Sequence, residues 1–223
     1  MLGSSGPAAV LRVIVGAVAC TLWTAAAAAP EARHPISIDD LLRNQRVSDV
    51  QISPNGNAVV YTIASSNLGS NQNESNIWLA STTQPEIRQL THTGKDRSAR
   101  WAPDGKRLAF LSKRDGKSQV FLLTLDGGEA RALTHMPTDI ETVRWSPDGM
   151  TLVASAAVDP DCNDEACNKA HEEKKALGDN TRVYDEWPLS TATSWMDGRR
   201  SHLFAISAYG TEAPRDLTPG AAR

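Results

Sequence analysis

One turn sequence occurs three times at nearly even spacing along the chain. The copies read Trp-Ser-Pro-Asp-Gly at 145–149, Trp-Ala-Pro-Asp-Gly at 101–105 and Ile-Ser-Pro-Asn-Gly at 52–56. Their prolines are 49 and 44 residues apart, counting from position 54 to 103 and from 103 to 147. Repeats of this length are typical of the four-stranded blades of β-propellers. The spacing therefore predicts an all-β fold built from similar blades.

The residues of this turn suit a tight connection between two antiparallel strands. Proline fixes φ at the second turn position, Asp or Asn bonds its own backbone, and Gly accepts the left-handed conformation that follows. The flanking segments alternate between apolar and polar residues, which is the period of half-buried strands. Strands are predicted at 49–52, 58–64, 77–80, 87–91, 99–101, 108–111, 119–124, 130–134, 143–145, 152–154 and 201–206, with the polar segment 65–75 as a loop.

A Leu-Thr pair near the end of each repeat sets the blade boundaries. The pair occurs at 90–91, 133–134 and 217–218, so the first interval is 43 residues and the second is 84. Blade three is therefore predicted to carry an inserted helical or loop segment at about 159–196. The predicted blades cover about 48–92, 98–135 and 141–218 within a partial propeller at 48–223. Three blades form an arc, whereas closed propellers have about four to eight.

The first 29 residues have the pattern of a secretory signal peptide. Arg12 is the only charged residue before Glu31, and an apolar stretch and five alanines at 25–29 follow it. This order of positive start, apolar centre and small residues predicts cleavage near Pro30 and a secreted or periplasmic protein without a stable membrane span. An uncleaved anchor and a lipoprotein site at Cys20 are the alternatives. Segment 30–47 is predicted to hold a short helix capped by Ser37, with its leucines toward the core.

Only two cysteines follow the predicted signal peptide, and four residues separate them. In an oxidising compartment, Cys162 and Cys167 are expected to form a local disulfide that pins the insertion. A metal-binding pair is the competing interpretation, but no second ligand pair with zinc spacing follows. The acids at 159, 161, 164 and 165 match the calcium-loop pattern poorly. No metal and no cofactor are predicted.

Composition excludes one large class of partner. Hydrophobic residues make up 40% of the chain and charged residues 22%, with a net charge of −3. These proportions are ordinary for a globular protein. Nucleic-acid binding requires clustered Lys and Arg to neutralise phosphates, and the chain has no such cluster. A nucleic-acid partner is therefore not expected.

Several segments resemble one family of peptidases. They are Ile-Asp-Asp-Leu-Leu at 38–42, the Ser-Pro-Asp-Gly turns, Arg-Val-Tyr-Asp at 182–185 and Trp-Met-Asp-Gly-Arg-Arg-Ser-His-Leu-Phe at 195–204. Together they resemble the N-terminal propeller of secreted dipeptidyl-peptidase and acylaminoacyl-peptidase-like enzymes of the prolyl oligopeptidase family. The turn repeats alone are also similar to those of TolB-like periplasmic propellers. A non-enzymatic, TolB-like protein-binding propeller is therefore the alternative.

The resemblance implies a function for the chain within a larger serine exopeptidase. In that family the propeller caps a C-terminal α/β-hydrolase domain, filters peptide substrates by size and helps to hold the peptide N-terminus. The hydrolase motif G-x-S-x-G does not occur in the 223 residues, so the hydrolase domain is expected to be absent and this chain alone inactive. His92 and His135 each follow a repeated Leu-Thr pair and are interpreted as repeat features rather than catalytic bases.

Paired acids in the insertion are the candidates for substrate contact. Glu172 with Glu173, and Asp185 with Glu186, could hold a protonated peptide amine through charge-assisted hydrogen bonds. The competing interpretation of Glu172 and Glu173 is a solvated helix face, because they lie in helical register with lysines. For that pair the solvated face is favoured.

Overall fold

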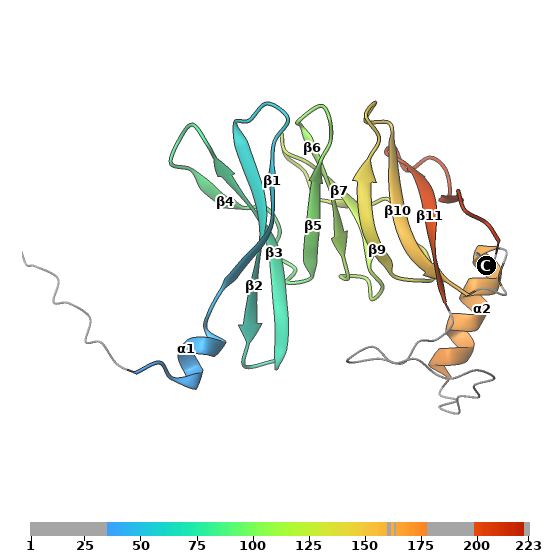
Figure 1. The fold of residues 1–223 in the computed structure, drawn as a ribbon, viewed down its shortest axis with the longest axis horizontal. Helices are drawn as coiled ribbons and strands as arrows, with labels where there is room; N and C mark the ends of the chain where they lie inside the picture. The colour runs from blue at the N-terminus through green and yellow to red at the C-terminus, as the bar shows by residue number, and fades with distance from the viewer. Residues whose placement is uncertain (1–34, 160–161, 163, 178–198, 221–223) are drawn as a thin grey trace, which may run out of the picture. The chain divides into compact units, whose positions relative to one another are not determined.

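The structure is a computed structural model that describes residues 35–159, 162, 164–177 and 199–220 (Figure 1). All of its helices and strands belong to the compact unit Ser37–Arg223, and the preceding unit is described only at Pro35 and Ile36. The predicted signal peptide, Asp185 and Glu186 lie outside the described residues. No helix in the described ranges is long and apolar enough to span a membrane.

Three four-stranded antiparallel sheets make up the fold, and each corresponds to one predicted blade (Figure 1). Blade one contains β1 (Arg46–Ile52), β2 (Ala58–Asn67), β3 (Gln72–Ser81) and β4 (Ile87–Gln89). Blade two contains β5 (Asp96–Trp101), β6 (Arg107–Ser112), β7 (Gln119–Thr124) and β8 (Arg131–Ala132). Blade three contains β9 (Ile140–Trp145), β10 (Thr151–Val158), β11 (Arg200–Ser207) and β12 (Arg215–Asp216). Within each sheet the strands lie in sequence order, which confirms the all-β, partial-propeller prediction.

The repeated turn joins the first two strands of each blade and also touches the blade before it. The glycines at 56, 105 and 149 have φ of 75°, 67° and 69°, a region that favours glycine. A Cβ built on Gly105 would lie 3.8 Å from Pro54, and one on Gly149 would lie 3.4 Å from Pro103. Successive turns therefore stack, glycine against the preceding proline.

The two repeat tryptophans link successive blades. The indole N–H of Trp101 donates to the carbonyl of Gln51 at 3.1 Å, and that of Trp145 donates to the carbonyl of Arg100 at 3.0 Å. Both side chains are half-buried and pack against the hydrophobic clusters between blades. These contacts place both tryptophans at the interfaces between blades.

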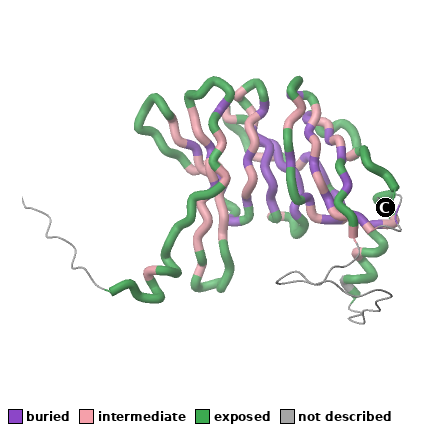
Figure 2. The backbone as a smooth tube through the Cα atoms, in the orientation of Figure 1, coloured by how far each residue is buried: buried purple, intermediate pink, exposed green. Residues whose placement is uncertain are grey.

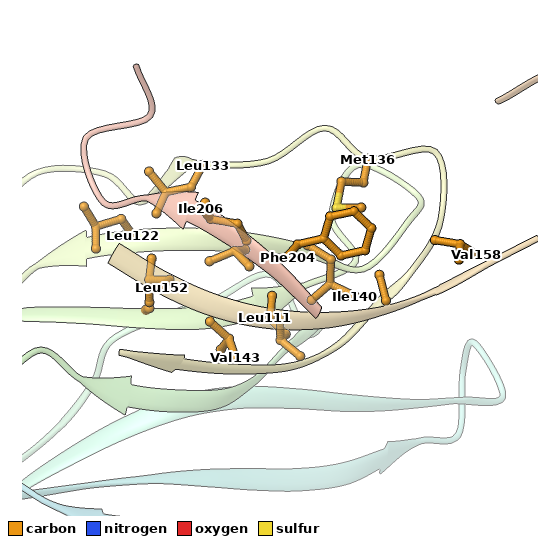
Figure 3. Close-up of a cluster of buried hydrophobic side chains, with 14 residues drawn as sticks. Leu111, Leu122, Leu133, Met136, Ile140, Val143, Leu152, Val158, Phe204 and Ile206 are labelled. Atoms are coloured by element: carbon orange, nitrogen blue, oxygen red, sulfur yellow. The ribbon is translucent and has the colours of Figure 1, made fainter. Parts of the chain in front are cut away.

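Two clusters of apolar side chains form the core, one in each seam between neighbouring blades. Figure 2 shows buried residues concentrated in the strands of blades two and three. The cluster between blades two and three includes side chains from both sheets, among them Leu111, Leu122, Ile140, Leu152, Phe204 and Ile206 (Figure 3). The cluster between blades one and two includes Val60, Ile77, Leu79, Leu108, Phe110 and Phe121. Alternate residues of each strand supply these side chains, as sheet geometry requires.

The segment 65–75 contradicts the loop prediction. β2 extends to Asn67 and β3 begins at Gln72, so only 68–71 form a turn. The paired residues include Ser65 with Glu74 and Asn67 with Gln72. The Asn67 side-chain amide also donates to the Glu74 carboxylate at 2.6 Å. Backbone ladder bonds do not require apolar side chains, and cross-strand polar pairs support the hairpin.

The short helix before blade one agrees with the sequence in position but not in packing. α1 spans Ile38–Leu42, and Ser37 and Asp40 form a reciprocal capping box. The leucines, expected to face the core, are instead exposed: Leu41 by 65% and Leu42 by 37%. A five-residue helix with a complete cap is held by local hydrogen bonds, which explains why it forms without burying its leucines.

Candidate functional site

The insertion in blade three begins with a helix whose ends follow ordinary capping chemistry. α2 spans Glu165–Ala176, and the Asp164 side chain caps it by accepting a hydrogen bond from the Cys167 N–H at 2.8 Å. Glu165 lies in the first turn, and Lys174 and Lys175 lie in the last turn. These charges oppose the helix dipole at both ends and stabilise the helix.

The segment leading into α2 is fastened to the helix by a disulfide and an amide. Cys162 and Cys167 are joined by a disulfide in the structure. The side chain of Asn168, only 8% exposed, accepts from the Asp159 N–H and donates to the Asp164 carbonyl, both at 2.9 Å. Asp164 therefore caps the helix, and the backbone groups of Asp159 and Asp164 fasten the segment to it.

Glu172 ties α2 to two different blades. Its carboxylate pairs with Lys117, from the hairpin between β6 and β7, and with Arg199, which precedes β11. Burial raises the pKa of the Glu172 carboxyl, but the hydrogen bonds and charges of Lys117 and Arg199 outweigh it and hold the pKa below its ordinary value. We call these three residues the Glu172 latch.

The other predicted contact residues are placed differently. Glu173 points its carboxylate to solvent, with 67% of the side chain exposed and Lys169 at 4.0 Å. Asp185 and Glu186 lie outside the described residues. Adjacent glutamates on a helix point in different directions, which is why Glu172 is engaged while Glu173 is solvated.

A cavity of about 260 Å³ lies where α2 meets the seam of blades two and three. Met136, Val158 and Phe204, which also belong to the apolar cluster (Figure 3), form part of its lining. Its polar lining consists of Thr138, Asp164, Glu165, Asn168 and Asp216. Such a lining can accept an apolar group that carries a hydrogen-bond donor or a positive charge.

Two polar features were missed by sequence reasoning: Thr138 in the cavity lining, and His202, which contacts the lining residue Asp216. The Thr138 hydroxyl is buried and has no hydrogen-bond partner among the described residues. His202 is 6% exposed, and its Nδ1 lies 2.7 Å from an Asp216 carboxylate oxygen. The Thr218 N–H donates to the other Asp216 oxygen at 2.8 Å, which fixes the carboxylate. Residues 202 and 216 lie on the neighbouring strands β11 and β12. His202 falls within the segment 195–204 that carries the family resemblance, but nothing in the sequence pairs it with Asp216.

The histidines that follow the Leu-Thr pairs have no such environment. His92 and His135 are both exposed, and each directly follows the threonine of its own blade. The threonines have the structural role, because Thr91 and Thr134 each accept a hydrogen bond from a strand N–H at 3.0 Å. This placement agrees with their interpretation as repeat features.

Comparison with known proteins places this architecture in a family. The model of the TolB beta propeller domain matches residues 43–196, which include all three turn repeats and the insertion. The chain belongs to the TolB β-propeller domain family. This TolB-type propeller is 36% identical over 126 residues to the uncharacterized peptidase YuxL of Bacillus subtilis, covering 55% of the chain and 19% of that protein.

Other relatives of the propeller are also peptidases. Dipeptidyl-peptidase 5 of Porphyromonas endodontalis is 31% identical over 119 residues, covering 53% of the chain and 17% of that protein. The chain thus matches about a fifth of the length of these relatives. Among solved structures, Pyrococcus horikoshii acylaminoacyl peptidase superposes with a TM-score of 0.60 at 19% identity, over 79% of the chain and 26% of that protein. This likeness supports the fold.

Proposed function

We propose that this chain is the substrate-gating propeller portion of a secreted serine exopeptidase that releases dipeptides or acylated residues from peptide N-termini. The observation that carries the proposal is the similarity of the blades to two peptidases at more than 30% identity. Under this proposal an α/β-hydrolase domain supplies the nucleophile, and the propeller controls which peptides reach it. Export through the N-terminal signal sequence is part of the same proposal.

The latch supports a division of roles among the acidic residues of the insertion. Glu172 is already neutralised by two cations, so a peptide amine gains little from it and its role is to anchor the insertion. Glu173 keeps an exposed carboxylate, and Asp185 and Glu186 belong to the same insertion. We therefore assign the contact with a protonated peptide amine to these three acids, by charge-assisted hydrogen bonding.

Two matched substrates test the proposal and its two sub-classes. The complete gene product is assayed with a dipeptidyl p-nitroanilide bearing a free amine and with the N-acetylated aminoacyl p-nitroanilide. Cleavage of either substrate, abolished by a serine-directed inhibitor, is expected, and preference for the free amine identifies a dipeptidyl peptidase. The isolated 223-residue chain is expected to cleave neither. Inhibitor-sensitive turnover by that chain, or no turnover of either substrate by the complete product, would overturn the proposal.

A TolB-like protein-binding propeller is the second candidate, favoured by one surface. Val47, Ile52 and Ile87 of blade one are 60%, 65% and 65% exposed, and exposed apolar groups at a sheet face are suited to protein contact. Under this candidate the chain associates with itself or with another protein through that face. Sedimentation of the pure chain tests it, since a folded monomer that does not change with concentration or on Ile52→Asp substitution counts against it.

A further inference from the structure

Three side chains with soft metal-donor atoms meet at the start of α2. One donor atom from each of Cys162, Cys167 and His171 lies within 4.8 Å of those of the other two. Cys167 and His171 are four residues apart on the helix and therefore share one face. Cys162 reaches the same face from the segment that precedes the helix. Sulfur and imidazole donors are the ligands that zinc prefers in proteins.

The placement of these residues has support besides the disulfide. The Cys162 N–H donates to the Asp159 carbonyl at 3.0 Å. Asn168 holds both Asp159 and Asp164, and Asp164 caps the helix beside Cys167. Because these hydrogen bonds involve neither sulfur atom, they keep the two cysteines side by side when the disulfide is opened.

The histidine has a carboxylate partner of the kind that metal-binding histidines usually have. His171 Nδ1 lies 2.8 Å from an Asp159 carboxylate oxygen. A carboxylate that accepts from Nδ1–H fixes the tautomer in which Nε2 carries the lone pair, and this arrangement recurs behind metal-binding histidines. The His171 side chain is 45% exposed, so an ion can approach from solvent and a water molecule can complete the coordination.

We propose that reduction of the Cys162–Cys167 disulfide creates a zinc site formed by both thiolates and His171, with Asp159 as a positioning residue. A dithiol reductant supplies two electrons and two protons to the disulfide and is itself oxidised to a disulfide. Binding of Zn²⁺ then displaces the two thiol protons to solvent. In the oxidised chain both sulfurs are bonded to each other, and the site has no thiolate to offer.

The distances suit this change. Zn–S bonds of about 2.3 Å and Zn–N bonds of about 2.0 Å put tetrahedral ligand atoms about 3.5–3.8 Å apart. The donor atoms, now within 4.8 Å of one another, need to move by only about 1 Å with respect to the imidazole. The sulfurs separate as the disulfide opens, by rotation of two cysteine side chains whose backbones are held in place.

Cobalt(II) is the probe, because tetrahedral cobalt–thiolate sites have intense visible bands. The full chain, with Cys20→Ser to remove the third cysteine, is reduced with a phosphine, desalted without oxygen and titrated with Co²⁺. One equivalent is expected to give the tetrahedral spectrum, and Zn²⁺ is expected to displace it. Asp159→Asn is expected to lower the affinity about 10–100-fold and His171→Ala by at least about tenfold. His135→Ala, at an exposed histidine of blade two, is the matched control and should leave the titration unchanged.

Each alternative result of this titration overturns the proposal. A reduced chain that gives no tetrahedral spectrum has no such site. If His171→Ala and His135→Ala bind cobalt equally well, the dithiol alone holds the ion and the three-residue site is wrong. Equal binding by the oxidised chain would show that the ion is held elsewhere.

Discussion

Replacing Glu172 with alanine is expected to release the insertion from the blades. Glu172 is 15% exposed and holds Lys117 and Arg199, whose side chains are 46% and 19% exposed. The neighbouring Glu173→Ala change is the matched control, because Glu173 is the next residue of the same helix. Its side chain is 67% exposed and has only a long contact to Lys169. Both substitutions leave helix propensity nearly the same.

The size of the effect follows from the exposure of each partner. Hydrogen bonds to charged groups contribute about 1.5–3 kcal/mol when shielded, and exposed ion pairs contribute at most about 1 kcal/mol. The partly shielded Arg199 contact is therefore worth about 1.5 kcal/mol and the solvated Lys117 contact about 0.5 kcal/mol. Their sum of about 2 kcal/mol corresponds to a roughly 30-fold change in the local opening equilibrium.

Amide hydrogen exchange read out by mass spectrometry measures this opening peptide by peptide. In Glu172→Ala the amides of α2 should lose protection by roughly 30-fold, while the strands of blade one keep theirs. Glu173→Ala should change α2 protection by less than about twofold. Equal loss of protection in the two variants would refute the assignment of Glu172 as the anchor.

The latch should also fail in acid. The pKa of Glu172 in the folded chain lies below its ordinary value of 4.5 because Lys117 and Arg199 outweigh its burial. The unfolded chain then binds more protons, so the latch stabilises fully above pH 4.5 and loses its contribution as pH falls through the lower folded pKa. Protection factors, corrected for intrinsic exchange, should converge between wild type and Glu172→Ala below that pH. A difference that widens in acid contradicts this account.

Three further substitutions test the blades by urea denaturation. Asp96→Ala should lower the free energy of unfolding by about 3 kcal/mol, because the fully buried Asp96 carboxylate pairs with the Arg114 guanidinium at 3.0 Å and its loss leaves that cation without this partner. The control Asp126→Ala, at an exposed position, should change it by no more than about 0.5 kcal/mol. Thr138→Val should stabilise by about 1 kcal/mol because the buried hydroxyl has no partner among the described residues; a loss of stability would indicate an unseen partner. Trp145→Phe should lower the free energy of unfolding by about 1–2 kcal/mol, because it removes the inter-blade hydrogen bond. An unchanged free energy of unfolding would show that this bond does not stabilise the fold.

The features of the fold that could be predicted are those determined locally. Proline and glycine in the turn have conformational requirements that residue type alone reveals, and β7 was predicted with its observed bounds, Gln119–Thr124. The hairpin of β2 and β3 was predicted too short because its tip is polar. Its strands persist through backbone pairing and bonds such as Asn67 to Glu74, which hydrophobic alternation does not detect.

The candidate site was harder to predict because its contacts join distant positions. Glu172 and Lys117 are 55 residues apart, and the helical register of Glu with Lys pointed instead to a solvated face. His202 and Asp216 meet only because β11 and β12 pair in one register. The cysteine pair, by contrast, lies close in sequence, and the structure joins it in a disulfide.

The latch constrains where a charged ligand could contact the insertion without loosening it. The seam of blades two and three is held at the turn end of β10 by Trp145 and by Arg107, which donates to the Gly149 carbonyl at 3.1 Å. At the other end of β10, the same seam is bridged through Glu172 by Lys117 and Arg199. A ligand carboxylate that recruited either cation would compete with Glu172 and loosen the insertion. A ligand amine would compete with Lys117 and Arg199 for the single Glu172 carboxylate, so a charged group of either sign at this point would weaken the latch. The proposed contact with a peptide amine therefore requires a carboxylate outside the latch, such as the exposed Glu173.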